Sequence, residues 1–462
     1  MSSLWSHDEL IAALGGTAHA SFDAYAVAFD SREIGQGDLF FAMKGEATDG
    51  HLFIDKAFTS GAAGAIVSET VAHPHILVDD TMDALNALGR ASRARVDAKI
   101  IGVTGSAGKT GTKEALYAAL DRSSRGHAHR SVKSYNNHVG VPLSLARMPR
   151  DTQFGIFEMG MNHPGELSKL TQLVRPHVAI VTTIAPAHIG FFKDEAEIAD
   201  AKGEIFEGLM PGGTAIIPSD NAHCPRLRTA AEKHAAHIVS FGFAEGSDVR
   251  VLDHVASPDG GSLITAKLPS GRLCYTLSQP GKHWIANSLA VLAAVEAVGG
   301  DLAAAGLAMA ELGGMAGRGA RHKITFGKGT ATLIDESYNA NPASMAATIG
   351  ELASHIDGRR IVVLGAMKEL GSKADDYHLA LAKPMAEANV DYAILVGEEM
   401  QILVEKLKAG LEGPTKFAHC ATAREALDLL RDNLRDSDTI LVKGSNSMGL
   451  STIITALVGE AN

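Results

Sequence analysis

The chain has 462 residues, of which 46% are hydrophobic and 21% are charged. This balance is typical of a folded protein with buried cores and excludes a largely disordered chain; at about 150 residues per domain it allows about three domains. The 42 Lys and Arg residues against 53 Asp and Glu residues give a net charge of −11, and no dense basic run is present. We therefore expect no nucleic-acid partner.

Cysteine use and hydrophobic pattern indicate the compartment. Cys224, Cys274 and Cys420 lie far apart and form no CxxC pair, which suits a reducing environment. No apolar run approaches the about 18 residues of a membrane span. Asp8 and Glu9 stand where a signal peptide would be basic and then apolar. The expected location is cytoplasmic, without membrane insertion.

The first predicted domain covers residues 1–98 and is a small α/β domain. Ser6 and Glu9 have the spacing of a capping box, which predicts a short helix that ends at the glycines 15–16. Short apolar runs predict strands at 38–42, 64–67 and 75–78. A stretch with helical periodicity predicts a helix at 82–95.

The second predicted domain, residues 99–316, alternates strands and helices as a mainly parallel sheet does. Its predicted strands are 100–103, 154–157, 177–183 and 214–217. Residues 247–280 break this pattern, because Asp259-Gly260-Gly261 and Pro269-Ser270-Gly271 are turn signals between short strands. We expect an antiparallel appendage there.

The third predicted domain, residues 317–462, follows a glycine-dense hinge at 313–319. Its predicted strands are 332–334, 361–364, 392–396 and 439–442. They alternate with predicted helices, which indicates a Rossmann-like arrangement. The expected fold class is therefore α/β with three domains, of which the central one carries a phosphate loop.

That loop is Thr104-Gly105-Ser106-Ala107-Gly108-Lys109-Thr110, between a predicted strand and a predicted helix. Glycines let backbone N–H groups face phosphate oxygens at a helix N-terminus. Lys109 can reach the outer phosphates, and the Thr110 hydroxyl suits Mg²⁺. Val103 stands where the strict Walker A pattern has glycine. A tight turn with an incidental lysine is the alternative, but the flanking elements favour nucleotide binding.

Polar residues after the next strands suggest a metal site. Glu158 follows the strand 154–157, at the edge where open α/β sheets bind ligands, and could hold Mg²⁺. His188 follows the strand after that. Taken alone, a glutamate or histidine at such a position is more often a residue without a metal-binding role. Lys202, taken alone, is interpreted as a solvent-exposed lysine of a helix. Asn136 and Asn137 lie in a turn-forming patch that could bind a substrate phosphate. Only the combination of these residues, at regular strand spacing after a phosphate loop, favours a metal site at Glu158 and His188.

Five segments together resemble the Mur ligases, the ATP-dependent amide-forming enzymes of peptidoglycan precursor synthesis. The resemblance covers essentially the whole chain. The segments that carry it are Asp30-Ser-Arg-Glu-Ile-x-x-Gly-Asp-Leu-Phe-Phe-Ala with Asp49-Gly-His51, Thr104 to Thr110, Glu158-Met-Gly-Met-Asn-His-Pro-Gly-Glu166, Ile184-Ala-Pro-Ala-His188 and Asp335-Glu-Ser-Tyr-Asn-Ala-Asn-Pro342. The last segment is the most discriminating, because the family member that adds the third amino acid carries Asp-Asn-Pro-Arg there. The members for the first two amino acids lack the Asp-Ser-Arg type of N-terminal domain.

The resemblance implies a ligase that joins D-alanyl-D-alanine to UDP-MurNAc-tripeptide through an acyl phosphate, with ATP and two Mg²⁺ ions. For the ATP and metal site it implies Thr104 to Thr110 with Lys109 on the phosphates, Thr110 and Glu158 on Mg²⁺, His188 with Lys202 (as a CO₂-derived carbamate) on a second Mg²⁺, Asn287, Arg318 and Asp335. For the substrates it implies Ser31, Arg32, Lys44, Thr48, Asp49, His51, Asn136, Asn137, Tyr338, Asn339 and Asn341. A monomer is expected.

Two positions depart from the family pattern. Ala366 stands where aspartate is usual and Asn446 where arginine is common, and both lie in the third domain, where the dipeptide is expected to bind. Three alternatives stay open: a sister ligase with another amine, a P-loop ATPase that acts as a switch, and a degenerate binding protein. The sequence does not decide whether the tripeptide ends in diaminopimelate or lysine.

Overall fold

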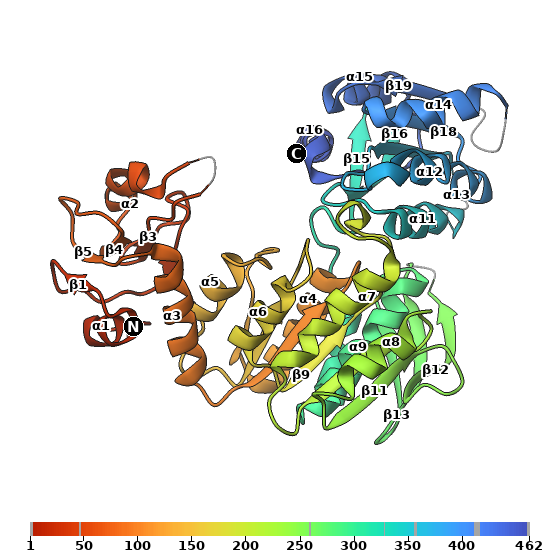
Figure 1. The fold of residues 1–462 in the computed structure, drawn as a ribbon. Coiled ribbons are helices and arrows are strands. Elements are labelled where there is room, and N and C mark those ends of the chain that lie inside the picture. The colour runs from red at the N-terminus through yellow and green to blue at the C-terminus, as the bar shows by residue number, and fades with distance from the viewer. Residues whose placement is uncertain are drawn as a thin grey trace.

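The computed structural model describes residues 3–45, 48–257, 260–327, 329–354, 358–410 and 416–459. Its strands form three separate sheets that follow one another along the chain, each with helices packed beside it (Figure 1). The N-terminal and C-terminal parts lie on different sides of the central part, which confirms the predicted α/β fold of three domains. None of the described helices is long and apolar enough to cross a membrane.

The N-terminal sheet has the strand order β1-β5-β4-β3-β2, with β1 antiparallel to β5 and the other pairs parallel. Its strands are β1 (Thr17–Ala18), β2 (Val27–Ala28), β3 (Leu39–Phe41), β4 (Gly64–Val67) and β5 (His75–Leu77), and its helices are α1 (His7–Leu14), α2 (Ile54–Thr59) and α3 (Thr81–Ala94). Helix α1 begins at His7 with Ser6 as its N-cap and Glu9 completing the capping box, and it ends before Gly15, whose φ is 67°, as predicted.

The central sheet has the order β14-β13-β12-β11-β10-β9-β6-β8-β7. Every neighbouring pair between β7 and β12 in this order is parallel. The β12–β13 and β13–β14 pairs are antiparallel and form the predicted appendage. The strands are β6 (Lys99–Thr104), β7 (Ala128–Arg130), β8 (Phe154–Glu158), β9 (Val178–Val181), β10 (Thr214–Pro218), β11 (His237–Gly242), β12 (Val249–Ala256), β13 (Ser262–Leu268) and β14 (Gly271–Leu277). Asp259, in the first predicted turn, lies outside the described residues.

Helices cover both faces of the central sheet because its strands alternate their buried side chains between the faces. Ile101 and Val103 of β6 pack in one cluster with α4 (Lys109–Ser124), α9 (Lys282–Ala297) and α10 (Leu302–Ala310). Ile100 packs in another cluster with the helices of the opposite face, which are α5 (Gly140–Ala146), α6 (Glu166–Val174), α7 (Glu195–Gly203) and α8 (Cys224–Ala231). Because β8 and β9 are parallel neighbours of β6, the carboxyl ends of these three strands lie at the same edge of the sheet, where α4 begins.

The C-terminal sheet has the order β15-β16-β20-β17-β18-β19, parallel except for the β15–β16 hairpin. Its strands are β15 (Ala320–Phe326), β16 (Gly329–Glu336), β17 (Arg360–Gly365), β18 (Tyr392–Val396), β19 (Phe417–Cys420) and β20 (Thr439–Lys443). Its helices are α11 (Pro342–Glu351), α12 (Ala374–Leu379), α13 (Ala382–Glu387), α14 (Gln401–Lys408), α15 (Ala423–Asn433) and α16 (Ser451–Gly459).

One apolar cluster runs without interruption from the central domain into the C-terminal domain. It contains Ile189 and Phe192 of the segment after β9 together with Met367 and Leu370 of the loop after β17. The C-terminal domain therefore packs directly on the edge of the central sheet where the phosphate loop lies.

Candidate active site

The predicted phosphate loop joins β6 to α4, and its glycines are required by its geometry. Gly105 has φ 146° and Gly108 has φ 81°, a region that side chains rarely adopt. A Cβ atom on Gly105 would lie 1.9 Å from the Thr182 hydroxyl. That hydroxyl, after β9, donates to the carbonyl of Ala107 at 2.5 Å, so the loop is held against the neighbouring strand. The result is a rigid turn at a helix N-terminus.

Lys109 lies over this loop rather than pointing into solvent. Its Nζ atom donates to the carbonyl of Gly105 at 2.6 Å. Burial lowers the pKa of the Lys109 ammonium, whereas the nearby Glu158 carboxylate raises it. The cation is thus held where a phosphate chain at the loop would meet it.

Glu158, the last residue of β8, contacts the residues that the sequence placed beside it. Its side chain is fully buried. Oε2 accepts a hydrogen bond from the Thr110 hydroxyl at 2.9 Å, and Oε1 accepts one from the Asn136 amide at 2.7 Å. The hydroxyl and the carboxylate are both hard oxygen ligands of the kind that Mg²⁺ prefers, so this pair fits the ion.

His188 has φ 59° and lies in the turn after β9. Its Nδ1 atom pairs with the Glu369 carboxylate of the C-terminal domain, and the Gly190 N–H donates to the Glu369 carbonyl at 2.9 Å. Burial lowers the pKa of His188, and the positive charge of Lys109 lowers it further. Sequence reasoning missed Glu369. The available signal was its place in the glycine-bounded segment 365–371, which follows a predicted strand.

Lys202 corrects the solvated-helix interpretation that the sequence alone favoured. It lies in α7, and its side chain is 2% exposed because this part of the helix packs into the central core with Ile198 and Ala201. Among the described residues it has no hydrogen-bond or ion-pair partner. Burial lowers the pKa of Lys202 well below its usual value, and the charge of Lys109 adds to this effect.

A cavity of about 380 Å³ adjoins the phosphate loop. Its wall includes Ala107 and Gly108 of the loop, Trp284 and Asn287 of α9, and residues of α11. The Asn287 amide lies so near the loop that a Cβ atom on Gly108 would be 2.8 Å from its Nδ2 atom. The cavity wall is mainly apolar with some polar groups, as the wall of a small-molecule site usually is.

Several predicted residues of the hinge and the C-terminal domain meet at this cavity. The Asn341 amide donates to the carbonyl of Ser106 in the phosphate loop at 3.3 Å. The Arg318 guanidinium donates to the Ser134 hydroxyl at 3.2 Å, and its carbon lies 4.4 Å from the centre of the Tyr338 ring. Arg318, Asn339 and Asn341 line the cavity. The site thus combines two domains.

Asp335 and Tyr338 are not among the residues that line the cavity. The Asp335 carboxylate is buried and accepts from the Gly317 N–H at 2.6 Å and from the Ser337 hydroxyl at 2.6 Å. In this structure Asp335 therefore holds the hinge turn, and Tyr338 is 40% exposed beside Arg318.

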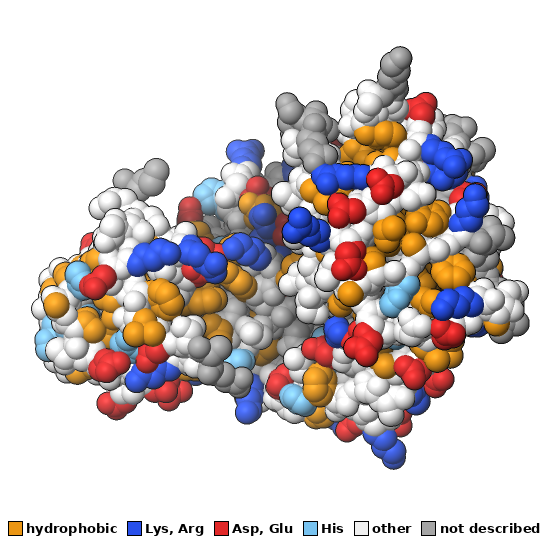
Figure 2. All heavy atoms as spheres, turned by 90° about the horizontal axis from the view of Figure 1, so that it is seen from above, with side chains coloured by type: hydrophobic (Ala, Val, Ile, Leu, Met, Phe, Trp, Pro, Cys, Tyr) orange, Lys and Arg blue, Asp and Glu red, His pale blue; other side chains and the backbone are white. Residues whose placement is uncertain are grey.

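The predicted nucleotide-sugar residues gather on the N-terminal domain, apart from the cavity. Arg32 forms a two-pronged ion pair with Asp30, and the His51 ring contacts Asp49 at 2.6 Å and the Ser68 N–H at 3.0 Å. Lys44 lies 3.9 Å from Glu69, Ser31 is buried and Thr48 is exposed. Figure 2 shows a hollow between this lobe and the rest of the molecule.

Glu33, next to this group, links the two domains. It accepts from the Tyr135 hydroxyl at 2.9 Å, and its other oxygen lies 3.3 Å from the Arg147 guanidinium. The Asn137 side chain accepts at 2.9 Å from the N–H of Gly140, the first residue of α5. Asn136, bound to Glu158, therefore lies between the N-terminal lobe and the phosphate loop.

Comparison with known proteins agrees with this arrangement. Three family models match: the Mur ligase family catalytic domain at residues 23–119, the Mur ligase middle domain at 103–295 and the Mur ligase glutamate ligase domain at 320–446. A UDP-N-acetylmuramoyl-tripeptide–D-alanyl-D-alanine ligase of Escherichia coli is 33% identical over 94% of this chain and 93% of its own length. The Bacillus subtilis enzyme of that name is 31% identical over the same shares.

Solved structures agree with these sequence comparisons. MurF from Acinetobacter baumannii has a TM-score of 0.84 and 31% identity, and the match covers 98% of this chain and 99% of that one. MurF from Thermotoga maritima in complex with ADP has a TM-score of 0.77 and 25% identity, over 94% and 97% of the two chains. With relatives of this identity matching all three domains, the chain belongs to the Mur ligase family of ATP-dependent amide-forming ligases.

Proposed function

We propose that the chain adds D-alanyl-D-alanine to UDP-MurNAc-tripeptide with ATP, giving UDP-MurNAc-pentapeptide, ADP and phosphate. The observation that carries this is the cavity beside the phosphate loop, which Ala107 and Gly108 line together with residues of the C-terminal domain, while the same loop carries Lys109 and the Thr110–Glu158 pair. The names of the full-length relatives support these substrates.

In this proposal the loop from Thr104 to Thr110 holds the ATP phosphates, with Asn287 near the adenine. Thr110 and Glu158 hold one Mg²⁺ ion through hydroxyl and carboxylate oxygens. Bound Mg²⁺ would offset negative charge on the transferring phosphoryl group. Arg318 approaches the phosphates from the hinge, and Asp335 is proposed at the ribose. The contacts of Lys109 and Glu158 support the first two assignments.

Lys202 is proposed to carry a carbamate that, with His188, holds a second Mg²⁺ ion. A neutral amine forms a new N–C bond with CO₂ and releases one proton, which turns a cation into an anionic oxygen ligand. Burial of Lys202 supports this proposal, since it favours the neutral amine. A cation without a partner would be costly there.

The reaction begins when the terminal carboxylate of the tripeptide attacks the γ-phosphorus of ATP. The bond to the leaving oxygen of ADP breaks, and an acyl phosphate forms. The amine of the dipeptide then attacks the acyl carbon, loses a proton, and phosphate leaves. Two anions approach each other in the first step, so the cations of Lys109 and Arg318 lower the barrier by stabilising the transferring group.

The remaining assignments concern the substrates and the assembly. The nucleotide sugar is proposed to contact Ser31, Arg32, Lys44, Thr48, Asp49, His51, Asn136 and Asn137, and the dipeptide and ATP to meet at Tyr338, Asn339 and Asn341. The domains are proposed to be residues 1–98, 99–316 and 317–462, which agrees with the spans of the three sheets. We also propose that the chain is a cytoplasmic monomer.

The test is phosphate release with ATP, Mg²⁺, UDP-MurNAc-tripeptide and D-alanyl-D-alanine, with each component omitted in turn. Release that needs both substrates, with the pentapeptide mass as product, is expected. Release that ignores both would replace the ligase by an ATPase switch, and a requirement for another amine would indicate a sister ligase. Lys109→Ala should abolish turnover while circular dichroism stays unchanged, and unchanged turnover would refute the role of the loop.

A further inference from the structure

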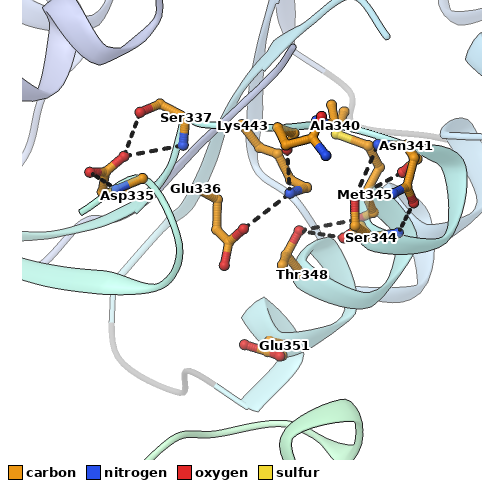
Figure 3. A network of polar contacts seen from close by, with 12 residues as sticks. Asp335, Glu336, Ser337, Ala340, Asn341, Ser344, Met345, Thr348, Glu351 and Lys443 are labelled. Atoms are coloured by element: carbon orange, nitrogen blue, oxygen red, sulfur yellow. Dashed lines mark hydrogen bonds and ion pairs between the residues drawn. The ribbon is translucent and has the colours of Figure 1, made fainter. Parts of the chain in front are cut away.

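Lys443 is a buried lysine of the C-terminal domain that the mechanism above does not use. It ends β20, and its register partner Glu336 ends the adjacent parallel strand β16. The Lys443 side chain is 2% exposed, and its Nζ atom donates to Glu336 Oε2 at 3.0 Å and to the Asn339 carbonyl at 3.0 Å. In Figure 3 its ammonium points into the turn that follows β16.

The same turn leads to the phosphate loop. Asn341 begins α11, and its side-chain oxygen accepts from the Ser344 N–H at 2.9 Å. The amide nitrogen of Asn341 donates to the Ser106 carbonyl at 3.3 Å. One side-chain group thus caps a helix of the C-terminal domain and contacts the central domain. The position of this turn decides whether that contact can form.

Lys443, Glu336, Asn339 and Asn341 all line the cavity, beside Ala107 and Gly108 of the phosphate loop. Breaking a buried ion pair leaves the other charge uncompensated and lets the anchored backbone move. The hydrogen bonds of such a network depend on one another. Loss of the Lys443 contacts is therefore expected to change the position of Asn341 at the other end of the turn.

We propose that Lys443 is a positioning residue for ATP: by binding the Glu336 carboxylate and the Asn339 carbonyl, it holds the turn that places Asn341 on the phosphate loop. This rests on the proposed function, in which the cavity takes the nucleotide. Lys443 is assigned no contact with the reacting atoms. Its effect is on the affinity for ATP and not on the nucleotide sugar, whose proposed residues lie on other elements.

The test compares steady-state kinetics of Lys443→Met with those of a matched control, Arg359→Met. Arg359 binds the buried Asp438 carboxylate at 3.0 and 2.8 Å, next to the opposite end of β20. Each variant loses an ion pair of the C-terminal domain in which one partner is buried. Lys443→Met is expected to raise KM for ATP by about tenfold or more, with KM for UDP-MurNAc-tripeptide within about twofold, whereas Arg359→Met leaves both unchanged.

Two further variants separate positioning from charge. In Lys443→Met/Glu336→Gln no carboxylate is left unpaired, so the protein should fold, and KM for ATP should stay raised because the Asn339 anchor is absent. Asn341→Ser keeps the helix cap but loses the amide donor. On the Lys443→Met background Asn341→Ser should raise KM for ATP by a smaller factor than it does in the wild type, because both substitutions remove the same contact to Ser106.

A wild-type KM for ATP in Lys443→Met would overturn the proposal, and so would its return in the double variant or independent effects of Lys443→Met and Asn341→Ser. Calorimetric titration with ADP keeps this separate from the proposed function. If Lys109→Ala binds ADP as the wild type does, the nucleotide site itself is misplaced. If Lys109→Ala loses ADP and Lys443→Met retains full affinity, only the role of Lys443 fails.

Discussion

Lys202 and Lys113 are two buried lysines of the central domain whose surroundings predict opposite effects of removing the charge. Lys202 is 2% exposed and has no hydrogen-bond or ion-pair partner in the described part of the chain. Lys113 is fully buried but donates to the carbonyls of Ser131 and Lys133 at 3.0 and 2.6 Å, and it lies 3.0 Å from the Glu114 carboxylate.

Methionine has nearly the shape of lysine without its ammonium group, so Lys202→Met removes mainly an unpaired polar group. Burial of such a group costs about 1–3 kcal/mol. We expect Lys202→Met to raise the free energy of unfolding by about that amount while it abolishes turnover, because no carbamate can form. Lys113→Met should lower the free energy of unfolding by about 3–5 kcal/mol, since its partners stay buried without a donor.

The assay is urea unfolding in degassed buffer without Mg²⁺, with Trp5→Phe as the common background. The fluorescence of Trp284, in α9, then reports the central domain alone. In a second series with Mg²⁺ present throughout, added bicarbonate should stabilise the parent and leave Lys202→Met unchanged, since a ligand that binds the folded state stabilises it. A lower unfolding free energy in Lys202→Met, comparable with that in Lys113→Met, would refute the reasoning, as would retained turnover.

Three further predictions test single contacts. Gly105→Ala should raise KM for ATP by about tenfold or more, because its Cβ would lie 1.9 Å from the Thr182 hydroxyl; Gly212→Ala, with φ 80° and open space, should not. Glu158→Gln should raise the Mg²⁺ concentration needed for half-maximal phosphate release by about tenfold, and an unchanged titration would contradict its metal role. Burial lowers the pKa of His129 to about 4, so the unfolded chain takes up a proton that the folded chain refuses as the pH falls from 6.5 towards 4. Urea unfolding should show a loss of about 3 kcal/mol over that range, smaller in His129→Gln.

The elements that sequence reasoning missed share a physical reason. Strands β1, β2, β7 and β19 have two to four residues, and β1 is exposed, so they carry no apolar pattern of their own. They exist because a neighbouring strand offers unpaired backbone groups. Strands β11 and β15 were also missed. Strand β11 begins with the exposed His237, and β15, the hairpin partner of β16, carries several exposed or half-buried residues. The longer buried strands, such as β6 and β18, were predicted nearly to the residue.

The candidate site shows the same division. Local chemistry was enough to single out the phosphate loop, since its glycines and lysine lie within seven residues. For Glu158, His188 and Lys202 local chemistry favoured ordinary roles, and their assignment came from the resemblance to a family. Nothing local indicated that Lys202 would be buried or that Glu369 would meet His188 from another domain.

The sequence by itself determined the α/β class, the order of three domains, the phosphate loop and the family, because these depend on periodicity and on short contiguous motifs. Only the tertiary structure decided which carboxylate meets which hydroxyl, that Asn341 reaches Ser106, and that Lys443 is buried beside Glu336. These contacts join residues more than 40 positions apart. Their formation depends on the packing of whole sheets and helices, which no local pattern encodes.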